Sequence, residues 1–155
     1  MKEVIEGFYE AFQDKDFEKM VSFYHQEITF SDPAFGTLKG ERAKNMWRML
    51  LETGKDFKID YSNISFDQKI GKANWEAHYT FSKTNRKIHN KITAHFKFKE
   101  GKIIEHIDDF NLRKWAQQAL GLKGTILGGT KFFRSKLQNQ TNRMLDKFEE
   151  KIKNQ

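Results

Sequence analysis

The chain has 155 residues, enough for one domain with a sizeable core, and its aromatic fraction of 14% can supply much of the burial. Its net charge is +7, but the basic residues are scattered and not interleaved with aromatic ones, so we do not expect a nucleic-acid-binding surface. The absence of cysteine excludes disulfides and thiolate metal sites, and with no signal-peptide pattern and no long apolar run we expect a cytoplasmic protein.

Apolar residues at helical spacing predict three helices in the first third of the chain. The apolar positions of the first are Val4, Ile5, Phe8 and Phe12. The second follows its expected N-cap, Asp16, and its apolar positions are Phe17, Met20, Val21 and Tyr24. The third follows Gly40, and its apolar positions are Ala43, Met46, Trp47, Leu50 and Leu51. Gly54 is the expected left-handed C-terminal cap of this helix.

Alternation of apolar and polar residues predicts the strands. They are 28–32, 57–66, 73–82, 87–99 and 102–110, with turns at KIGK, KTNR and KEGK. The first strand ends at Pro33 and leads into a turn, AFGTLKG. The alternation slips between Tyr61 and Ile64, which predicts a bulge. Helices followed by a mostly antiparallel sheet predict an α+β fold, in which a curved sheet closes over the helices as a cone.

The C-terminal part of the chain predicts a helix at 111–120, an apolar and glycine-rich segment, and a basic amphipathic helix at 131–153. The stripe of this last helix consists of Phe133, Leu137, Met144, Phe148 and Ile152, interrupted by Gln140 and Thr141. Because an isolated helix of this length is marginal in water, the stripe must dock on something. We favour the same or a partner subunit over an anionic membrane. The expected division is a cone at 1–121 and an appended linker and helix at 122–155.

Polar residues intrude on the apolar faces of the predicted strands. Asp32, Asn90, His106 and Asp108 all share a face with apolar neighbours. Burying an isolated carboxylate or imidazole is costly, so these side chains indicate a cavity with a polar floor. The other histidines, His25, His78, His89 and His95, fall on polar registers or in loops, and we expect them to be exposed. No cluster of metal ligands is legible in the sequence, and we expect no cofactor.

Each candidate residue has a structural alternative. Asp32 either caps the turn after it or acts as a catalytic or ligand-binding carboxylate. His106 and Asp108 lie two apart on one strand, so we expect them about 7 Å apart, addressing one ligand. The alternative is a buried network with Asn90 and Tyr79. The candidate ligand-binding residues, some of which could equally be core, are Trp47, Trp75, Tyr79, Asn90 and Phe110.

Two stretches resemble a known family. FYEAFQDKDFEKMVSFYHQEITFSDPAFGTLKG resembles the opening of the nuclear transport factor 2 superfamily, and KFKEGKIIEHIDDFNLRKWAQQALG resembles the closing hairpin of its bacterial SnoaL-like members. The resemblance covers residues 2 to about 121 and implies a cone-shaped α+β fold. Asp32 matches the catalytic base of the ketosteroid isomerase branch. That branch needs a phenolic donor where this chain has Phe8, and an acid near Asn90, so its oxyanion hole is not expected.

The epoxide hydrolase branch needs an inward-facing arginine, and Arg86 lies in a predicted turn. The cyclase branch uses a pocket histidine and aspartate, which His106 and Asp108 resemble. The expected function is therefore a small-molecule pocket, serving an isomerase, cyclase or lyase that uses Asp32, His106 and Asp108 for acid–base chemistry on an apolar substrate. The alternatives are a non-catalytic module for an apolar metabolite and a homodimeric interaction protein. A homodimer is expected, while peripheral membrane contact by the C-terminal helix is the less favoured alternative.

Overall fold

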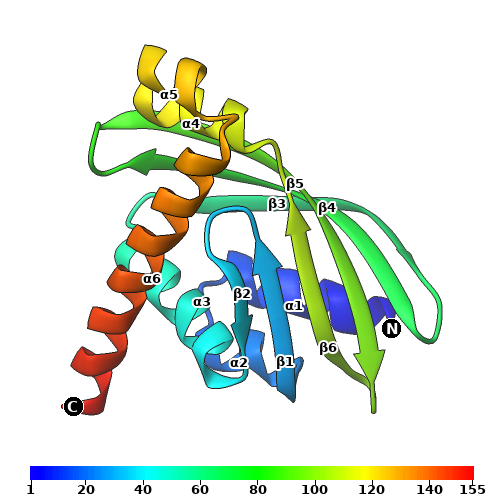
Figure 1. Cartoon of the computed structure of the whole chain (residues 1–155). Helices are drawn as coiled ribbons and strands as arrows, with labels where there is room; N and C mark the ends of the chain where they lie inside the picture. The colour runs from blue at the N-terminus through cyan, green and yellow to red at the C-terminus, as the bar shows by residue number, and fades with distance from the viewer.

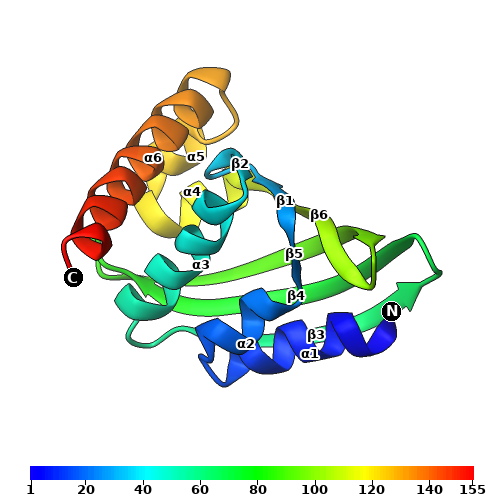
Figure 2. The ribbon, with the colours of Figure 1, turned by 90° about the horizontal axis from the view of Figure 1, so that it is seen from below.

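The computed structural model describes residues 1–155 as one curved sheet that partly encloses helices (Figures 1 and 2). The helices are α1 (Lys2–Gln13), α2 (Phe17–Ser22), α3 (Glu41–Thr53), α4 (Leu112–Leu120), α5 (Leu122–Leu127) and α6 (Lys131–Lys153). The strands are β1 (Tyr24–Asp32), β2 (Gly36–Lys39), β3 (Lys58–Phe66), β4 (Ile70–Phe81), β5 (Arg86–Lys99) and β6 (Lys102–Asp109). Their order in the sheet is β2-β1-β6-β5-β4-β3. The predicted α+β fold with a C-terminal helix is confirmed.

The sheet is mostly antiparallel, as expected, but it contains one parallel pair. β1 runs parallel to β6, with Phe30 opposite His106, while the other neighbours are antiparallel. The long antiparallel ribbon of β3 to β6 therefore joins the short hairpin of β1 and β2 along β6. This pairing brings the C-terminal ends of β1 and β6 to the same edge of the fold (Figure 1).

Large rings fill the space between the sheet and the helices. Phe8 and Phe12 of α1 are buried and pack edge-on against Trp47 of α3, with ring centroids 5.9 and 5.2 Å apart. Figure 2 shows α1 along β3, with α6 on the other side of the molecule beside α3. The 24-residue core cluster draws on α1, α2, α3 and the sheet, so the helices are part of the core rather than a cover over it.

β1 begins four residues before the predicted start at residue 28. Tyr24, expected on the second helix, is the first residue of the strand and is buried. Tyr24 follows Met20 by four residues in the sequence, a spacing that also fits a helix, and this explains the wrong assignment. The predicted turn AFGTLKG contains the strand β2, which pairs with β1 through Asp32 and Gly36. Gly36 has φ +74°, a conformation that glycine adopts without strain and that lets the chain reverse tightly.

The early start of β1 also buries His25, which we expected to be exposed. It is 5% exposed, its Nδ1 accepts the backbone N–H of Glu27, and its Nε2 lies 3.3 Å from Glu100 Oε2. The expectation of exposure holds for the three other histidines that were predicted to face solvent. Two of these, His78 and His89, are opposite each other on β4 and β5, and their rings stack at 4.1 Å.

Three further local predictions can be compared with the structure. The bulge in β3 is confirmed, since the register shifts between Ser62 and Ser65. A second bulge, in the β5–β6 pairing, was missed, and it places Ile103 rather than Ile104 in the core. Gly54 has φ −83°, so it is not a left-handed cap. A Cβ there would lie 2.9 Å from the carbonyl oxygen of Leu50, so glycine serves a close approach instead.

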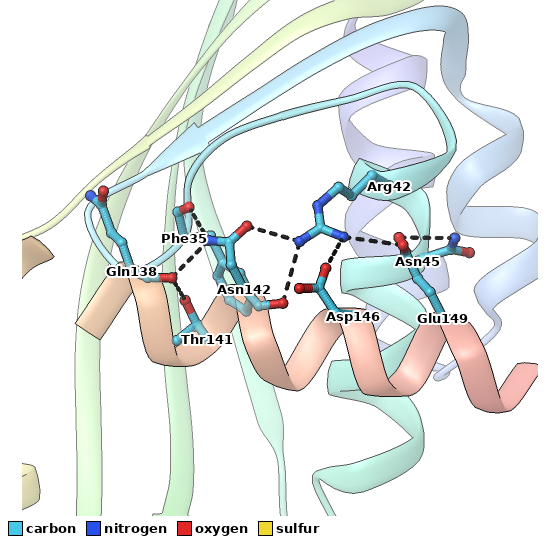
Figure 3. Close-up of polar contacts among 8 residues, drawn as sticks. All are labelled: Phe35, Arg42, Asn45, Gln138, Thr141, Asn142, Asp146 and Glu149. Carbon is cyan, nitrogen blue, oxygen red and sulfur yellow. Dashed lines mark hydrogen bonds and ion pairs between the residues drawn. The ribbon is translucent and has the colours of Figure 1, made fainter. Parts of the chain in front are cut away.

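The C-terminal helix α6 docks on its own chain through polar contacts (Figure 3). Its side chains donate hydrogen bonds to three successive carbonyl oxygens of the loop after β1. The bonds are Gln138 to Pro33 at 3.2 Å, Thr141 to Ala34 at 2.8 Å and Asn142 to Phe35 at 2.9 Å. Thr141 interrupts the predicted apolar stripe, yet it faces the fold. Its hydroxyl has a hydrogen-bond partner there, the carbonyl oxygen of Ala34. The segment before α6, expected to be a linker, contains α5.

Ion pairs and one buried leucine complete the docking of α6. The Nη1 atom of Arg42, on α3, lies 2.8 Å from Asp146 Oδ1 and 3.1 Å from Glu149 Oε2. Leu145 is fully buried, whereas Met144, which the predicted stripe included, is 48% exposed. The stripe is therefore displaced by one residue at this point. None of the helices is both long enough and apolar enough to cross a membrane.

This displacement gives a matched pair of substitutions. Leu145→Ala removes a fully buried side chain, and we expect it to lower the free energy of unfolding by about 2–5 kcal/mol. Met144→Ala, one residue earlier on the same helix, should change it by less than about 0.5 kcal/mol. Urea denaturation followed by circular dichroism measures both. Equal losses in the two variants would contradict the docked position of α6.

Candidate functional site

Five polar side chains form a continuous row of hydrogen bonds through the core, which we call the buried row. The indole N–H of Trp47 donates to Tyr24 Oη at 2.8 Å, and Tyr24 Oη lies 2.7 Å from His106 Nδ1. His106 Nε2 lies 2.9 Å from Asp108 Oδ1, which also accepts the indole N–H of Trp75 at 3.1 Å. The row thus connects α3, β1, β6 and β4.

The row has one consistent assignment of protons. Because Asp108 can only accept when ionised, His106 Nε2 carries the hydrogen and Nδ1 accepts from the Tyr24 hydroxyl. That hydroxyl is then free to accept from Trp47. Burial, with a smaller contribution from the charge of Asp108, raises the pKa of Tyr24 well above its ordinary value, so the hydroxyl keeps its proton.

His106 lies among aromatic rings and is fully buried. The centroids of Phe8, Phe30 and Phe96 lie 5.4, 5.2 and 4.6 Å from that of the imidazole, and Trp47 stacks on it at 5.9 Å. A side chain on the wall of an open cavity would retain exposed surface. The expected cavity therefore does not reach His106, because aromatic side chains occupy the space around it.

The structure changes the expected geometry of the pair on β6. His106 and Asp108 were expected about 7 Å apart, from the spacing of side chains along a strand. Their side chains instead turn toward each other and form a direct hydrogen bond. The partners predicted for a buried network, Tyr79 and Asn90, are replaced by tyrosine and tryptophan side chains of the buried row. Tyr79 Oη accepts the indole N–H of Trp115 at 2.7 Å instead.

The other candidate residues occupy different depths. Trp47 and Trp75 are 2% and 6% exposed and belong to the core as well as to the buried row. Phe110 is partly buried and packs against both hydrophobic clusters. Asn90 is partly buried, on the same face of β5 as the core residue Ile92. Sequence reasoning missed Tyr24, whose only signal was that the β1 alternation can be extended back to it.

Asp32 ends β1 and holds the following loop. Its Oδ1 accepts the backbone N–H groups of Ala34 at 2.9 Å and Phe35 at 2.6 Å, which is the turn-capping arrangement. Its Oδ2 accepts no hydrogen bond from the protein. Burial is the main cause that raises its pKa from 3.8 to about 7; the negative charge of Asp108 adds to this, and the N–H bonds of the loop oppose it.

A surface hollow of about 450 Å³ opens beside Asp32. It is lined by Ser31, Asp32, Pro33, Gly36, Thr37, His95, Ile107, Asp108, Asp109 and Arg134. Carboxylates from β1 and β6 thus line the same hollow as Arg134, which lies on the first turn of α6. Burial of its hydroxyl raises the pKa of Tyr79 to about 12, and the negative charge of Asp32 makes a smaller contribution in the same direction. The structure therefore places Asp32 and Asp108 at the same hollow, with His106 hydrogen-bonded to Asp108 in the core.

The arrangement supports proton transfer rather than metal binding. No three histidine, cysteine, aspartate or glutamate side chains are grouped so that they could hold a metal ion. Asp32 combines a fixed oxygen, a second oxygen without a protein partner, and a pKa near neutrality, which are the properties of a group that exchanges protons.

Comparison with known proteins places this geometry among related folds. The model of the SnoaL-like domain family matches residues 5–106. No curated protein matches the chain in sequence. Among solved structures, TerC, crystallised with polyporic acid, is similar over 76% of this chain and 95% of its own, with 14% identity and a TM-score of 0.66.

Two further solved structures show the same fold. A nuclear transport factor 2-like protein of unknown function from Burkholderia pseudomallei is 13% identical over 77% of this chain and 96% of its own, with a TM-score of 0.68. An LEH-like epoxide hydrolase from M. tuberculosis is 17% identical over 80% of this chain and 92% of its own, with a TM-score of 0.64. At identities of 13% to 17%, these similarities show a shared fold and nothing more.

The buried row predicts the effect of removing its central hydroxyl. Tyr24→Phe leaves the Trp47 N–H and His106 Nδ1 without a partner, and we expect it to cost about 1–3 kcal/mol of unfolding free energy. Tyr9→Phe is the control, because the Tyr9 hydroxyl is buried and has no partner, so its removal should be neutral or stabilising. Chemical denaturation of both variants checks this. A neutral Tyr24→Phe would show that the row contributes no stability.

The raised pKa of Asp32 predicts a pH-dependent stability. The folded state holds the Asp32 proton up to about pH 7, whereas the unfolded state releases it near 3.8, so its favourable contribution is complete below pH 3.8 and is lost as pH rises through about 7. Asp32→Asn keeps the oxygen that caps the loop but cannot ionise. We expect the variant to gain stability relative to the parent protein between these pH values. Thermal unfolding across this range measures the difference, and parallel curves would refute the raised pKa.

Proposed function

The chain belongs to the SnoaL-like domain family, and on that premise we propose that it is a cofactor-independent enzyme that moves protons on a small organic molecule. The reaction class is that of an isomerase, cyclase or lyase. The observation that carries the proposal is the Asp32 carboxyl group, which lies beside the 450 Å³ hollow with a pKa of about 7. A group with this pKa is present in both protonation states at neutral pH, so it can accept a proton and return it.

Asp32 acts through its free oxygen. Its Oδ1 is fixed by the loop N–H groups, which leaves Oδ2 as the atom that accepts the proton from substrate. Burial is the main cause of the raised pKa of Asp32, and the negative charge of Asp108 adds to it. His106 and Trp75 hold Asp108 in place. His106 is a positioning residue in this scheme, because it is sealed from the hollow.

Arg134 supplies the positive charge that such chemistry needs. Removal of a proton beside a carbonyl group leaves negative charge on the carbonyl oxygen, and this charge must be stabilised. Arg134 lines the same hollow as Asp32, on the first turn of α6. In this scheme Arg134 stabilises the charge that a phenolic hydroxyl stabilises in the ketosteroid isomerases. This chain has Phe8, which lacks a hydroxyl, at the position of that phenol. The crystallisation of TerC with polyporic acid supports a small organic ligand for this fold.

A non-catalytic binding module is the second candidate. The observation that favours it is that both ring nitrogens of His106 are engaged within the core and that Asp108 is only 3% exposed. A pair with this role stabilises the fold and leaves the hollow to bind a ligand without reaction. The homodimer expected from the sequence remains a proposal.

Hydrogen–deuterium exchange tests the enzymatic proposal. In D₂O, the protein should catalyse exchange of the C–H protons beside the carbonyl group of small cyclic ketones, which exchange slowly without a catalyst, with a rate that rises through about pH 7 as Asp32 ionises. Asp32→Asn should lower this rate by about 100-fold or more, the usual contribution of a general base. NMR measures the exchange. Asp60→Asn, an exposed aspartate on β3, is the matched control and should leave the rate unchanged.

The same variants distinguish the two candidates. Binding of polyporic acid, followed by tryptophan fluorescence, reports ligand binding without chemistry. Binding by the parent protein in the absence of any exchange would support the binding module. Equal exchange rates in the parent protein and Asp32→Asn would reject Asp32 as the base.

A further inference from the structure

The short helix α5 packs with its glycines inward. Gly124 and Gly128 are buried against α4, and a Cβ at Gly124 would overlap the carbonyl group of Ala116. A Cβ at Gly128 would lie 2.6 Å from the Ala116 Cβ. The two helices therefore approach more closely than any larger residue allows. Because the glycines occupy the inner side, the large side chains of α5 must point outward.

This packing exposes a cluster of apolar side chains, which we call the apolar tip: Leu122, Ile126, Leu127 and Phe132. They are 82%, 74%, 45% and 70% exposed. Figure 1 shows α5 at one end of the molecule, beyond the sheet and far from the N-terminus. Such a concentration within eleven residues differs from the scattered apolar residues of an ordinary surface and marks an interaction site.

The segment that carries the apolar tip is basic. Between Asp109 and Asp146 the sequence has no aspartate or glutamate. The basic surround consists of exposed lysines and arginines of this segment, Arg113, Lys114, Lys123, Lys131 and Lys136. Arg134 is not counted among them, because it lines the hollow beside Asp32. None of them takes part in an ion pair. Their charge is therefore available to a partner.

We propose that the apolar tip and the basic surround attach the protein to the surface of an anionic lipid membrane. Aliphatic and aromatic side chains enter the boundary between headgroups and acyl chains, while lysines and arginines are attracted to the anionic headgroups. The contact surface differs from the side of α6 that packs on the fold through Leu145 and Phe148. It is formed by α5, the first turn of α4 and the first turns of α6.

The composition of the surface selects this partner. A second copy of the chain would bring two basic surfaces together, which is electrostatically unfavourable. A nucleic acid would match the charge, but three of the four tip residues are aliphatic and offer no ring on which a base can stack. An anionic lipid surface accepts both the charge and the aliphatic side chains.

Vesicle sedimentation with the full chain tests the proposal. The protein should sediment with vesicles of phosphatidylglycerol and phosphatidylcholine in equal parts, should not sediment with phosphatidylcholine alone, and should be released by salt. The triple variant Leu122→Ser, Ile126→Ser, Phe132→Ser should bind at least about tenfold more weakly, because it cannot bury apolar surface in the bilayer. Lys123→Glu should weaken binding about fivefold or more, the fold-change that corresponds to about 1 kcal/mol per basic residue.

The double variant Phe66→Ser, Ile70→Ser is the matched control, because these residues are 49% and 54% exposed on β3 and β4, outside the basic surround. It should bind anionic vesicles like the parent protein. Circular dichroism should show that all variants are folded, since only exposed side chains are changed.

Three results would overturn the proposal. The first is a parent protein that does not sediment with the anionic vesicles. The second is a triple variant that binds as tightly as the control variant. The third is a dimer in size-exclusion chromatography that is lost in the triple variant, which would assign the apolar tip to a second copy of the chain.

Discussion

A row of hydrogen-bonded side chains crosses an interior that is otherwise filled by aromatic rings, and the placement of the site depends on it. In a dry core every polar group needs a partner, and the row satisfies imidazole, phenol, carboxylate and two indoles with one another. Tyr24 and His106 connect β1 to β6, the one parallel pair of the sheet. The row therefore holds the start of β1 against β6, and the pairing of Phe30 with His106 continues this contact toward Asp32.

The loop after β1 is held from both sides. Asp32 accepts the N–H groups of Ala34 and Phe35, while α6 donates to the carbonyl groups of the same loop. A helix more than a hundred residues away in sequence thus helps to determine the path of the chain beside Asp32. It also carries Arg134 into the same hollow. The C-terminal helix is consequently part of the candidate site, although a sequence-based division sets it apart from the cone.

The sequence predicts what depends on local periodicity and misses what depends on packing partners. Alternation placed Asp32, His106 and Asp108 on the inner face, and the structure brings them together. Tyr24 was misassigned because both a helical and a strand period fit it. Leu145 and Met144 are adjacent on one helix, so only the surface beneath decides which is buried. The tryptophans are apolar in any periodicity count, and nothing in the sequence shows where an indole N–H will donate.

The anchoring of the loop has a consequence for how this fold can diversify. Gln138, Thr141 and Asn142 bind main-chain carbonyl groups, which every amino acid possesses. At Ala34 the path of the loop therefore depends little on which side chain is present, because its carbonyl group makes the contact. Substitutions at Ala34, which is only partly buried, can alter the shape and polarity of the neighbourhood of Asp32 while the backbone keeps its course. Natural or laboratory selection for a new ligand can thus change the side chain at this position without changing the backbone around Asp32.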